Sequence, residues 1–217
     1  MIKSAAREFT LSGGRHDPGE FKEMATEVLE QATEERLIRR RASIEEFWSL
    51  PESVLPTEYI DGEIIMAPTP TVRHQRTLVN IFVPLHAFVT EKALGKVFPA
   101  PLDVVLPTGE VVQPDIFFLG TKQAERVSAA NKVEEVPPFL VEILSPSSVK
   151  HDTVRKRELY EKNGVREYWI VDMKERSIAQ LVLRKKHYVV TELGESDTIR
   201  GAVLAGFEMT VGEMLGT

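Results

Sequence analysis

The sequence contains no cysteine, and this absence excludes several kinds of chemistry. A thiol nucleophile, a disulfide framework and a cysteine-bound zinc are all impossible, so any metal must be held by oxygen or imidazole ligands. No apolar run approaches the roughly 18 residues that a membrane-spanning helix needs. The first residues, MIKSAAREFTLSGG, also lack the continuous apolar stretch of a signal peptide. We therefore expect a cytoplasmic protein that does not enter a membrane.

Several familiar motifs are missing as well. There is no Gly-x-Ser-x-Gly, no phosphate-binding Gly-Lys-Ser/Thr loop and no dinucleotide-binding Gly-x-Gly-x-x-Gly. His16, His86, His151 and His187 show no metal-binding spacing, and His-Glu-x-x-His is absent. The net charge of −6 argues against broad electrostatic binding to nucleic acid or to anionic membrane. The sequence thus gives no support to a serine hydrolase, a P-loop NTPase or a Rossmann protein.

What is present is an ordinary globular composition, 42% hydrophobic and 28% charged over 217 residues. At roughly 150 residues per domain, this length predicts one domain with an appendage. We expect residues 1–18 to form a flexible polar arm and residues 19–42 a helical extension with one apolar stripe. Residues 43–217 should then form a single α/β domain.

Hydrophobic periodicity within residues 43–217 predicts a mixed sheet flanked by helices. A capping box at Ser43 predicts a short helix, and the Asp61-Gly62 pair between two apolar runs predicts a β-hairpin. The elements expected after it are a helix at 71–94, strands at 97–106, 111–119 and 139–144, a helix capped by Ser145-Pro146-Ser147-Ser148 and running to about Lys162, a strand at 165–172, and a hairpin at 178–184 and 188–193. The helix between strands 139–144 and 165–172 permits a parallel strand pair.

Two carboxylates, Asp115 and Glu142, stand in strands that are otherwise apolar. A lone buried carboxylate costs several kcal/mol unless it finds a cation, a metal, several hydrogen-bond donors or a proton. If their strands are neighbours, both side chains can converge on one cation, and carboxylate oxygens suit Mg²⁺ or Mn²⁺. The structural alternative is that each acid pairs with a basic residue such as Arg155 or Arg73.

The helix that follows Glu142 adds a second group of candidates. Asp152, Lys156 and Tyr160 have the i, i+4, i+8 spacing of one helix face. Lys156 can orient a water, deprotonate it if its pKa is lowered, or stabilise charge on a phosphate. The same spacing also fits an Asp152–Lys156 pair on the surface.

His74 and Glu58 complete the set of candidate residues. His74 lies on the apolar row of the predicted helix at 71–94, where a histidine is more often a core residue than a ligand. Glu58 lies beside the Asp61-Gly62 hairpin and offers a further carboxylate, with exposure at a strand edge as its alternative.

Motifs spread over nearly all of residues 43–217 occur together in one order. They are Glu58-Tyr59-Ile60-Asp61-Gly62-Glu63, His74, Gln113-Pro114-Asp115, Val141-Glu142-Ile143-Leu144-Ser145-Pro146-Ser147, Lys156 with Tyr160 and Gly164-Val165, Tyr168-Trp169-Ile170-Val171-Asp172, and Gly206-Phe207. This set resembles the Uma-type family of restriction-endonuclease-like proteins, catalogued as a domain of unknown function within the PD-(D/E)XK nuclease superfamily. The resemblance implies an α/β fold with a restriction-endonuclease-like mixed sheet flanked by helices (order αβββαβ) and additional β-hairpins.

The resemblance also implies roles for individual residues. Asp115 corresponds to the superfamily's metal-binding aspartate, and Glu142 to the acid on its third core strand. The superfamily's lysine would stand two residues after this acid, where the sequence has Leu144. The resemblance therefore assigns the lysine's role to Lys156 on the following helix. Asp115, Glu142 and the backbone carbonyl of Ile143 would hold Mg²⁺ or Mn²⁺.

The implied activity is that of a metal-dependent endonuclease that hydrolyses phosphodiester bonds in DNA. Lys156 would position the attacking water, with auxiliary roles for Glu58, His74, Asp152 and Tyr160. Members of the superfamily often dimerise to cut both strands, and residues 20–41 are our candidate for a homodimer interface.

Two other function classes stay open. Leu144 at the usual lysine position fits a catalytically inactive nuclease-like module that binds nucleic acid or a protein partner. A structural interaction domain, with Asp115 and Glu142 as paired acids, is the third class. The distribution of charge favours contact with a phosphate, because residues 149–166 contain six basic and three acidic residues. A localised, metal-dependent contact with nucleic acid is thus compatible with the negative net charge.

Overall fold

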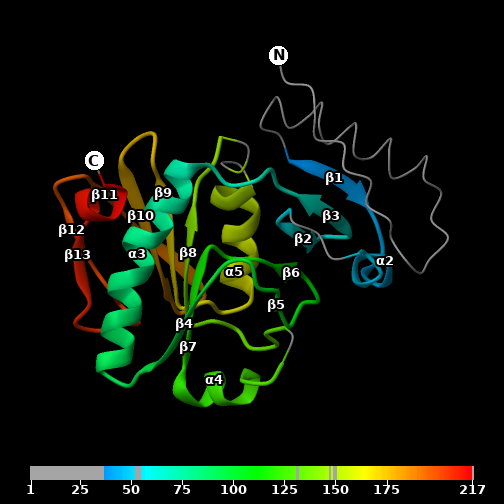
Figure 1. Ribbon diagram of the computed structural model, residues 1–217, viewed down its shortest axis with the longest axis horizontal. Coiled ribbons are helices and arrows are strands. Elements are labelled where there is room, and N and C mark those ends of the chain that lie inside the picture. Colours follow the sequence, from blue (N-terminus) through cyan, green and yellow to red (C-terminus); the bar gives the residue numbers. More distant parts are fainter. Residues whose placement is uncertain (1–36, 52–54, 131, 147, 149–150, 217) are drawn as a thin grey trace, which may run out of the picture. The chain divides into compact units, whose positions relative to one another are not determined.

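The computed structural model describes residues 37–51, 55–130, 132–146, 148 and 151–216 (Figure 1). All of them belong to one unit of the chain, residues 35–217. A six-stranded sheet with the order β11-β10-β9-β8-β7-β4 forms the centre of this unit. Its strands are β4 (Gly95–Pro99), β7 (Ile116–Gly120), β8 (Phe139–Ile143), β9 (Glu167–Asp172), β10 (Ser177–Arg184) and β11 (His187–Gly194).

The middle of this sheet contains the predicted parallel pair, β8 and β9, and the other strand pairs of the sheet are antiparallel. Between β8 and β9 the chain forms a π-helical segment, η1 (His151–Lys156), and then α5 (Arg157–Lys162). Such a crossover is what a parallel pair requires. All five residues of β8 are buried, as expected for a strand that is covered on both faces.

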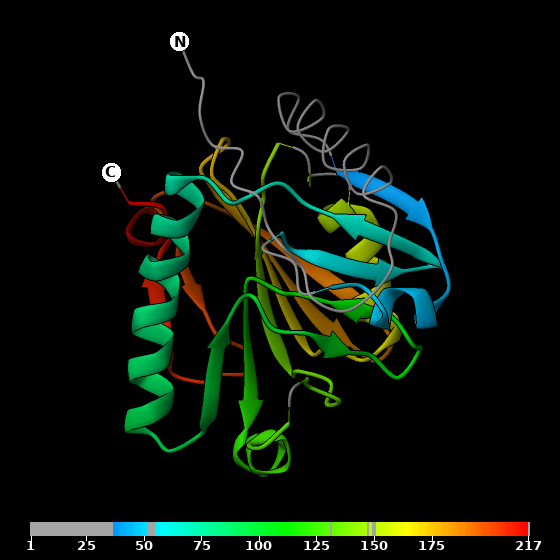
Figure 2. The same ribbon diagram turned by 45° about the vertical axis from the view of Figure 1, so that its right-hand side comes forward.

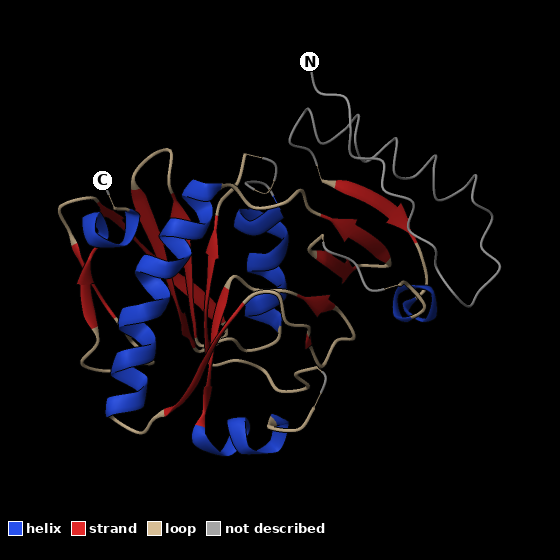
Figure 3. Ribbon diagram, viewed as in Figure 1, coloured by secondary structure: helices blue, strands red, loops and turns tan. Residues whose placement is uncertain are grey.

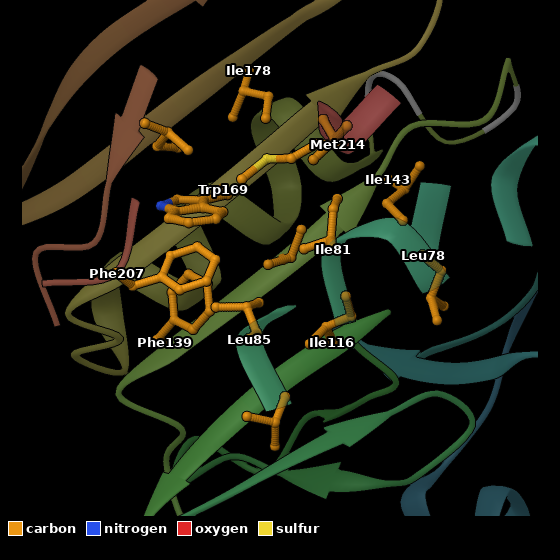
Figure 4. Close-up of a cluster of buried hydrophobic side chains, with 14 of the residues drawn as sticks. Leu78, Ile81, Leu85, Ile116, Phe139, Ile143, Trp169, Ile178, Phe207 and Met214 are labelled. Carbon is orange, nitrogen blue, oxygen red and sulfur yellow. The ribbon is translucent and has the colours of Figure 1, made fainter. Parts of the chain in front are cut away.

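One face of the sheet is covered by α3 (Val72–Glu91) and, from the end of the chain, by β12 (Thr198–Arg200), β13 (Glu208–Thr210) and α6 (Val211–Leu215). Figure 4 shows the core on this side, where Ile81 and Leu85 of α3 meet Phe139 and Trp169 of the sheet. Apolar helix residues at i and i+4 produce this contact, because they lie on one side of the helix. The predicted helix at 71–94 is therefore confirmed and faces the sheet.

The opposite face is covered by α5 and by a second sheet (Figures 2 and 3). This sheet has the order β1-β3-β2-β6-β5. Its strands are β1 (Ile38–Arg41), β2 (Thr57–Ile60), β3 (Glu63–Met66), β5 (Val104–Val105) and β6 (Val111–Val112). The core on this side includes Leu140, Tyr160 and Tyr168, so successive residues of β8 contribute to different cores.

Local sequence signals account for how the second sheet is built. Asp61 and Gly62 between β2 and β3 both have positive φ, as a type I′ turn requires, and the predicted hairpin is confirmed. The capping box of Ser43 is present and begins α2 (Ile44–Trp48). Residues 113–115 then carry the chain from β6 in the second sheet to β7 in the first.

Two predictions about elements are wrong, and one further helix has no counterpart among the predicted elements. Residues 38–41 pair with β3 as strand β1 and do not end a helix, because the hairpin offers them a strand edge. The apolar runs at 97–106 and 111–119 are divided into β4 and β5 and into β6 and β7, with Pro101 and Pro114 at the interruptions. The connection after β7 contains a further helix, α4 (Thr121–Val127).

The predicted arm at residues 1–18 and most of the predicted extension at 19–42 lie outside the described residues, as does most of the candidate dimer interface at 20–41. Among the helices that the structure describes, none has the length and apolar character to cross a membrane.

Candidate active site

The carboxyl end of β8 is the point where the sequence-predicted residues meet. Glu142 and Ile143 end this strand, and Asp115 immediately precedes the neighbouring strand β7. The other predicted residues arrive from β2, α3, η1 and α5, and they are Glu58, His74, Asp152, Lys156 and Tyr160. The fold therefore gathers side chains from several separate segments at one edge of the sheet.

Lys156 lies at the centre of a buried group of carboxylates. Its Nζ is 2.9 Å from Glu58 Oε1, 2.9 Å from Glu142 Oε1 and 3.4 Å from Asp152 Oδ1. Only 6% of the Lys156 side chain is exposed, so a surface pair with Asp152 is wrong. The face of η1 that carries Asp152 and Lys156 is buried and does not face the solvent.

The charge state of Lys156 follows from these contacts. Burial alone would lower the pKa of Lys156, but the charges of Glu142, Glu58 and Asp152 outweigh burial and raise this pKa well above its ordinary value. The ammonium group therefore stays protonated. A role as the base that deprotonates water, which the sequence left open, has no support from this environment.

Glu142 is held by two donors at the same oxygen. The Tyr160 hydroxyl donates to Glu142 Oε1 over 2.7 Å, beside the contact with Lys156. Burial raises the pKa of Glu142 well above its ordinary value, and the charges of Asp152, Asp115 and Glu58 add to this rise against the effect of Lys156. The carboxylates around Glu142 therefore carry more negative charge than the positive charge of Lys156 compensates.

Asp115 is adjacent to Glu142 because β7 and β8 pair with Ile116 opposite Val141. Its Oδ2 accepts a hydrogen bond of 2.7 Å from the Ile143 amide and lies 3.3 Å from His74 Nε2. The same His74 nitrogen is 3.1 Å from the Ile143 carbonyl oxygen. The two acids are therefore neighbours, and His74 lies beside two of the three predicted metal ligands.

His74 gains its proton affinity from Asp115. Burial alone would lower the pKa of His74, but the hydrogen bond and the charge of Asp115 outweigh burial and raise it. The ring is buried, as the core alternative expected, yet it contacts the site at the amino end of α3, where Thr71 caps the helix. His74 can therefore act as a hydrogen-bond donor in the site.

Glu58 connects the second sheet to the site. Its Oε1 accepts a hydrogen bond of 2.8 Å from the Gln113 amide, and its Oε2 lies 3.0 Å from His151 Nε2. Burial alone would raise the pKa of Glu58, but the charge of Lys156 and the contact with His151 outweigh it and lower this pKa to about 2. The side chain is buried, so exposure at a strand edge is wrong.

His151 and Tyr168 are members of the site that the sequence did not identify. His151 lacks the spacing of a metal ligand in the sequence, so it was not among the predicted site residues. The Tyr168 hydroxyl donates to the Asp152 carbonyl over 3.1 Å. The one available signal for His151 was its position next to Asp152 at the start of the helical segment. Its contact with Glu58 joins residues 93 positions apart, which no local pattern encodes.

The two arginines proposed as structural partners of the acids bind elsewhere. Arg155 donates to Asp61, Glu63 and the carbonyl of Ile60. Arg73 donates to the carbonyl of Met173. The acids at the end of β8 are therefore not neutralised by these arginines.

The oxygen atoms at the site suit a divalent cation with few protein ligands. Within the described part of the chain, no three His, Asp or Glu side chains form a group that would by itself hold a metal. Mg²⁺, however, usually takes only one or two carboxylates together with waters and substrate oxygens. Asp115, Glu142 and the Ile143 carbonyl offer donors of this kind, and the surplus of carboxylates around Lys156 favours a bound cation. The donor set therefore fits Mg²⁺ or Mn²⁺.

The fold and the site together define a nuclease-like protein with a restriction-endonuclease-like core. Residues 44–212 match the family model Uma2, described as "Putative restriction endonuclease", and the chain belongs to this family. The crystal structure of a putative nuclease belonging to DUF820 from Anabaena variabilis ATCC 29413 has the same fold. It has a TM-score of 0.70 and 20% sequence identity, covering 80% of this chain and 97% of that chain. None of the curated proteins compared with the sequence matches it.

Proposed function

We propose that the protein is an endonuclease that hydrolyses phosphodiester bonds in DNA with Mg²⁺ or Mn²⁺ as cofactor. The observation that carries this proposal is the meeting of Asp115, Glu142 and Lys156 at the carboxyl end of β8, next to His74 and Glu58. Family membership supports the nuclease class, and the oxygen donors support the metal.

Asp115, Glu142 and the Ile143 carbonyl would hold the cation, which when bound polarises the scissile phosphate and lowers the pKa of a water. The Ile143 amide fixes the Asp115 carboxylate through its hydrogen bond of 2.7 Å. Tyr160 and Lys156 fix the Glu142 carboxylate in the same way. The ligands are thus oriented before a cation arrives, which reduces the cost of binding it.

Lys156 supplies positive charge and does not remove a proton. Its ammonium contacts three carboxylates, so one of these contacts must be exchanged for an oxygen of the substrate or of water during the reaction. In that position the charge would stabilise the negative charge that develops on the phosphate. His74, with its raised pKa, would donate a hydrogen bond to the same phosphate.

The proposal is tested by incubating the purified chain with single-stranded, duplex and branched DNA in Mg²⁺ or Mn²⁺. Asp115→Asn and Glu142→Gln should each lower cleavage on the order of 100-fold or more. Glu125→Gln on the exposed face of α4 is the matched control and should cleave like the wild type. Cleavage unchanged in both site variants, with circular dichroism confirming their fold, would remove the proposal.

A second function has its own observation. Leu144 occupies the usual lysine position, and Lys156 is engaged by carboxylates, which together favour an inactive nuclease-like module that binds nucleic acid or a protein. Calorimetric titration with Mn²⁺ and with DNA separates the two functions. Binding of both without any cleavage would favour the inactive module, and absence of Mn²⁺ binding would favour a purely structural domain.

Two further parts of the proposal rest on the sequence and the family alone. A homodimer would allow both DNA strands to be cut, and light scattering at several concentrations measures it. Cytoplasmic location stays a prediction from the sequence, to be checked by fractionation of the source cells.

A further inference from the structure

A pocket with a volume of about 190 Å³ lies on the α5 side of the central sheet. Apolar side chains line its walls, among them Leu144, Ile170 and Leu181, and three charged residues, Arg157, Asp172 and Glu192, also line it. Clefts that hold whole ligands typically have roughly 300–1,000 Å³. This pocket therefore suits one part of a larger ligand.

The pocket is next to the candidate active site along the chain. Leu144 directly follows Ile143, and its side chain belongs to the same core as Tyr160, which donates to Glu142. Thr153 follows Asp152 in η1, and Arg157 at the start of α5 follows Lys156 at the end of η1, so site residues and pocket residues occupy adjacent positions along η1 and α5. A substrate with its phosphate at the carboxyl end of β8 can place its adjoining group in this pocket.

The lining has the chemistry of a nucleobase site. The aliphatic side chains of the lining can contact the faces of a base, and the carboxylates at the pocket can accept hydrogen bonds from the N–H groups of its edge. Asp172 Oδ1 accepts from the Lys174 and Glu175 amides at 2.8 and 2.9 Å, which fixes the orientation of this carboxylate. Arg157 and Glu192 are exposed to solvent.

We propose that this pocket binds an unstacked nucleobase of the substrate strand and prefers guanine. Guanine presents N1–H and N2–H₂ side by side, so one carboxylate, Glu192 or Asp172, can accept both hydrogen bonds. Arg157 would contact the phosphate of the same nucleotide. This inference rests on the proposed function in one respect: it assumes that the bound base belongs to the nucleic acid that the protein cleaves.

Binding of single nucleotides tests the pocket without any cleavage. dGMP, dAMP, dCMP, TMP and deoxyribose 5-phosphate are titrated by calorimetry into the full chain with EDTA present. dGMP should bind roughly tenfold more tightly than TMP, because a bidentate pair discriminates by about that factor. Ala179→Leu, which fills the pocket, should abolish binding of dGMP, and replacement of both carboxylates, Asp172→Asn together with Glu192→Gln, should remove the preference for it. Glu125→Gln should bind like the wild type.

The outcomes separate the pocket from the proposed function. Equal binding of all five compounds, or dGMP binding unaffected by Ala179→Leu, overturns the base pocket even if DNA is cut. Selective dGMP binding that is lost in Ala179→Leu supports the pocket even if no DNA is cut, and the endonuclease proposal then fails alone. Circular dichroism of each variant excludes unfolding as the cause of lost binding.

Discussion

Lys156 contacts three buried carboxylates, Glu58, Glu142 and Asp152. Each of these acids is less exposed than 10%, so water does not replace the lysine if it is removed. Buried ion pairs contribute little net stability as a whole, but removal of one partner leaves an uncompensated buried charge. Removal of Lys156 would therefore leave these three carboxylates without the cation that they share.

Lys156→Met is therefore expected to lower the free energy of unfolding by about 3–5 kcal/mol. Urea denaturation of the metal-free protein measures this loss. Lys162→Met on the exposed side of α5 is the control and should cost less than about 0.5 kcal/mol. A loss below about 1 kcal/mol for Lys156→Met would contradict the central position of this cation.

Glu58 makes the metal-free protein sensitive to acid. Burial acts to raise its pKa, but Lys156 and His151 outweigh burial and lower it from 4.5 to about 2. A carboxyl with a lowered pKa in the folded state stabilises that state above its unfolded pKa, and this stabilisation is lost as the pH falls through the folded value. The contribution of Glu58 should therefore decline between about pH 4.5 and pH 2.

Comparison of wild type with Glu58→Gln in EDTA measures this contribution. The wild type should be more stable on the order of 3 kcal/mol at pH 7, and this difference should shrink steadily in acid. Urea unfolding at closely spaced pH values gives the curve. A difference independent of pH would show that the Glu58 charge does not stabilise the fold.

At the scale of elements, Arg155 connects η1 to the β2–β3 hairpin through three hydrogen bonds. Its Nε is 2.9 Å from Asp61 Oδ2, its Nη1 is 2.9 Å from Glu63 Oε2, and its Nη2 donates to the Ile60 carbonyl over 2.8 Å. Glu58 stands in the same hairpin, and Lys156 follows Arg155 in η1. The arginine therefore holds together the two elements that carry the Glu58–Lys156 contact.

Arg155→Lys should loosen this hairpin, since one ammonium group does not reproduce three guanidinium hydrogen bonds. We expect a loss of about 1–2 kcal/mol in unfolding free energy and faster amide hydrogen exchange in residues 57–66. The control is Arg41→Lys, whose side chain is 82% exposed and 3.7 Å from Glu63, and it should cost less than about 0.5 kcal/mol. Unchanged amide hydrogen exchange in residues 57–66 of Arg155→Lys would show that Arg155 does not stabilise the hairpin.

At the scale of the whole molecule, a further buried carboxylate, at the start of β9, serves the structure. Glu167 is completely buried and accepts from Trp169 Nε1 at 2.8 Å and Gln180 Nε2 at 2.7 Å. It also accepts from the amides of Ala202 and Val203 at 2.9 and 2.7 Å. These bonds tie the segment before β13 to the central sheet, away from the site at the carboxyl end of β8.

Glu167→Gln should therefore separate stability from metal binding. It is expected to lower the unfolding free energy by about 2–4 kcal/mol, because an amide cannot accept all four bonds. Calorimetry with Mn²⁺, performed at a temperature where the variant is folded, should give wild-type affinity. Glu208→Gln on the exposed Arg200 pair is the control for stability. A parallel loss of Mn²⁺ affinity would mean that the two ends of the sheet are coupled.

Local features were predictable because neighbouring residues encode them. The capping box at Ser43, the turn at Asp61-Gly62 and the buried strand β8 follow from side chains a few positions apart. The crossover helix likewise predicted the parallel pairing of β8 with β9. The separated motifs were enough to predict the family that the comparison then confirmed.

The sequence by itself determined these elements, the fold class and the residue types available for chemistry. Only the tertiary structure decided that Lys156 is buried among three carboxylates, that His151 reaches Glu58, and that residues 38–41 form a strand. The physical reason is that periodicity and turn signals express preferences between near neighbours in the chain. Burial, ion pairing and strand pairing depend on which distant segments meet, and those contacts are settled by the packing of the whole domain.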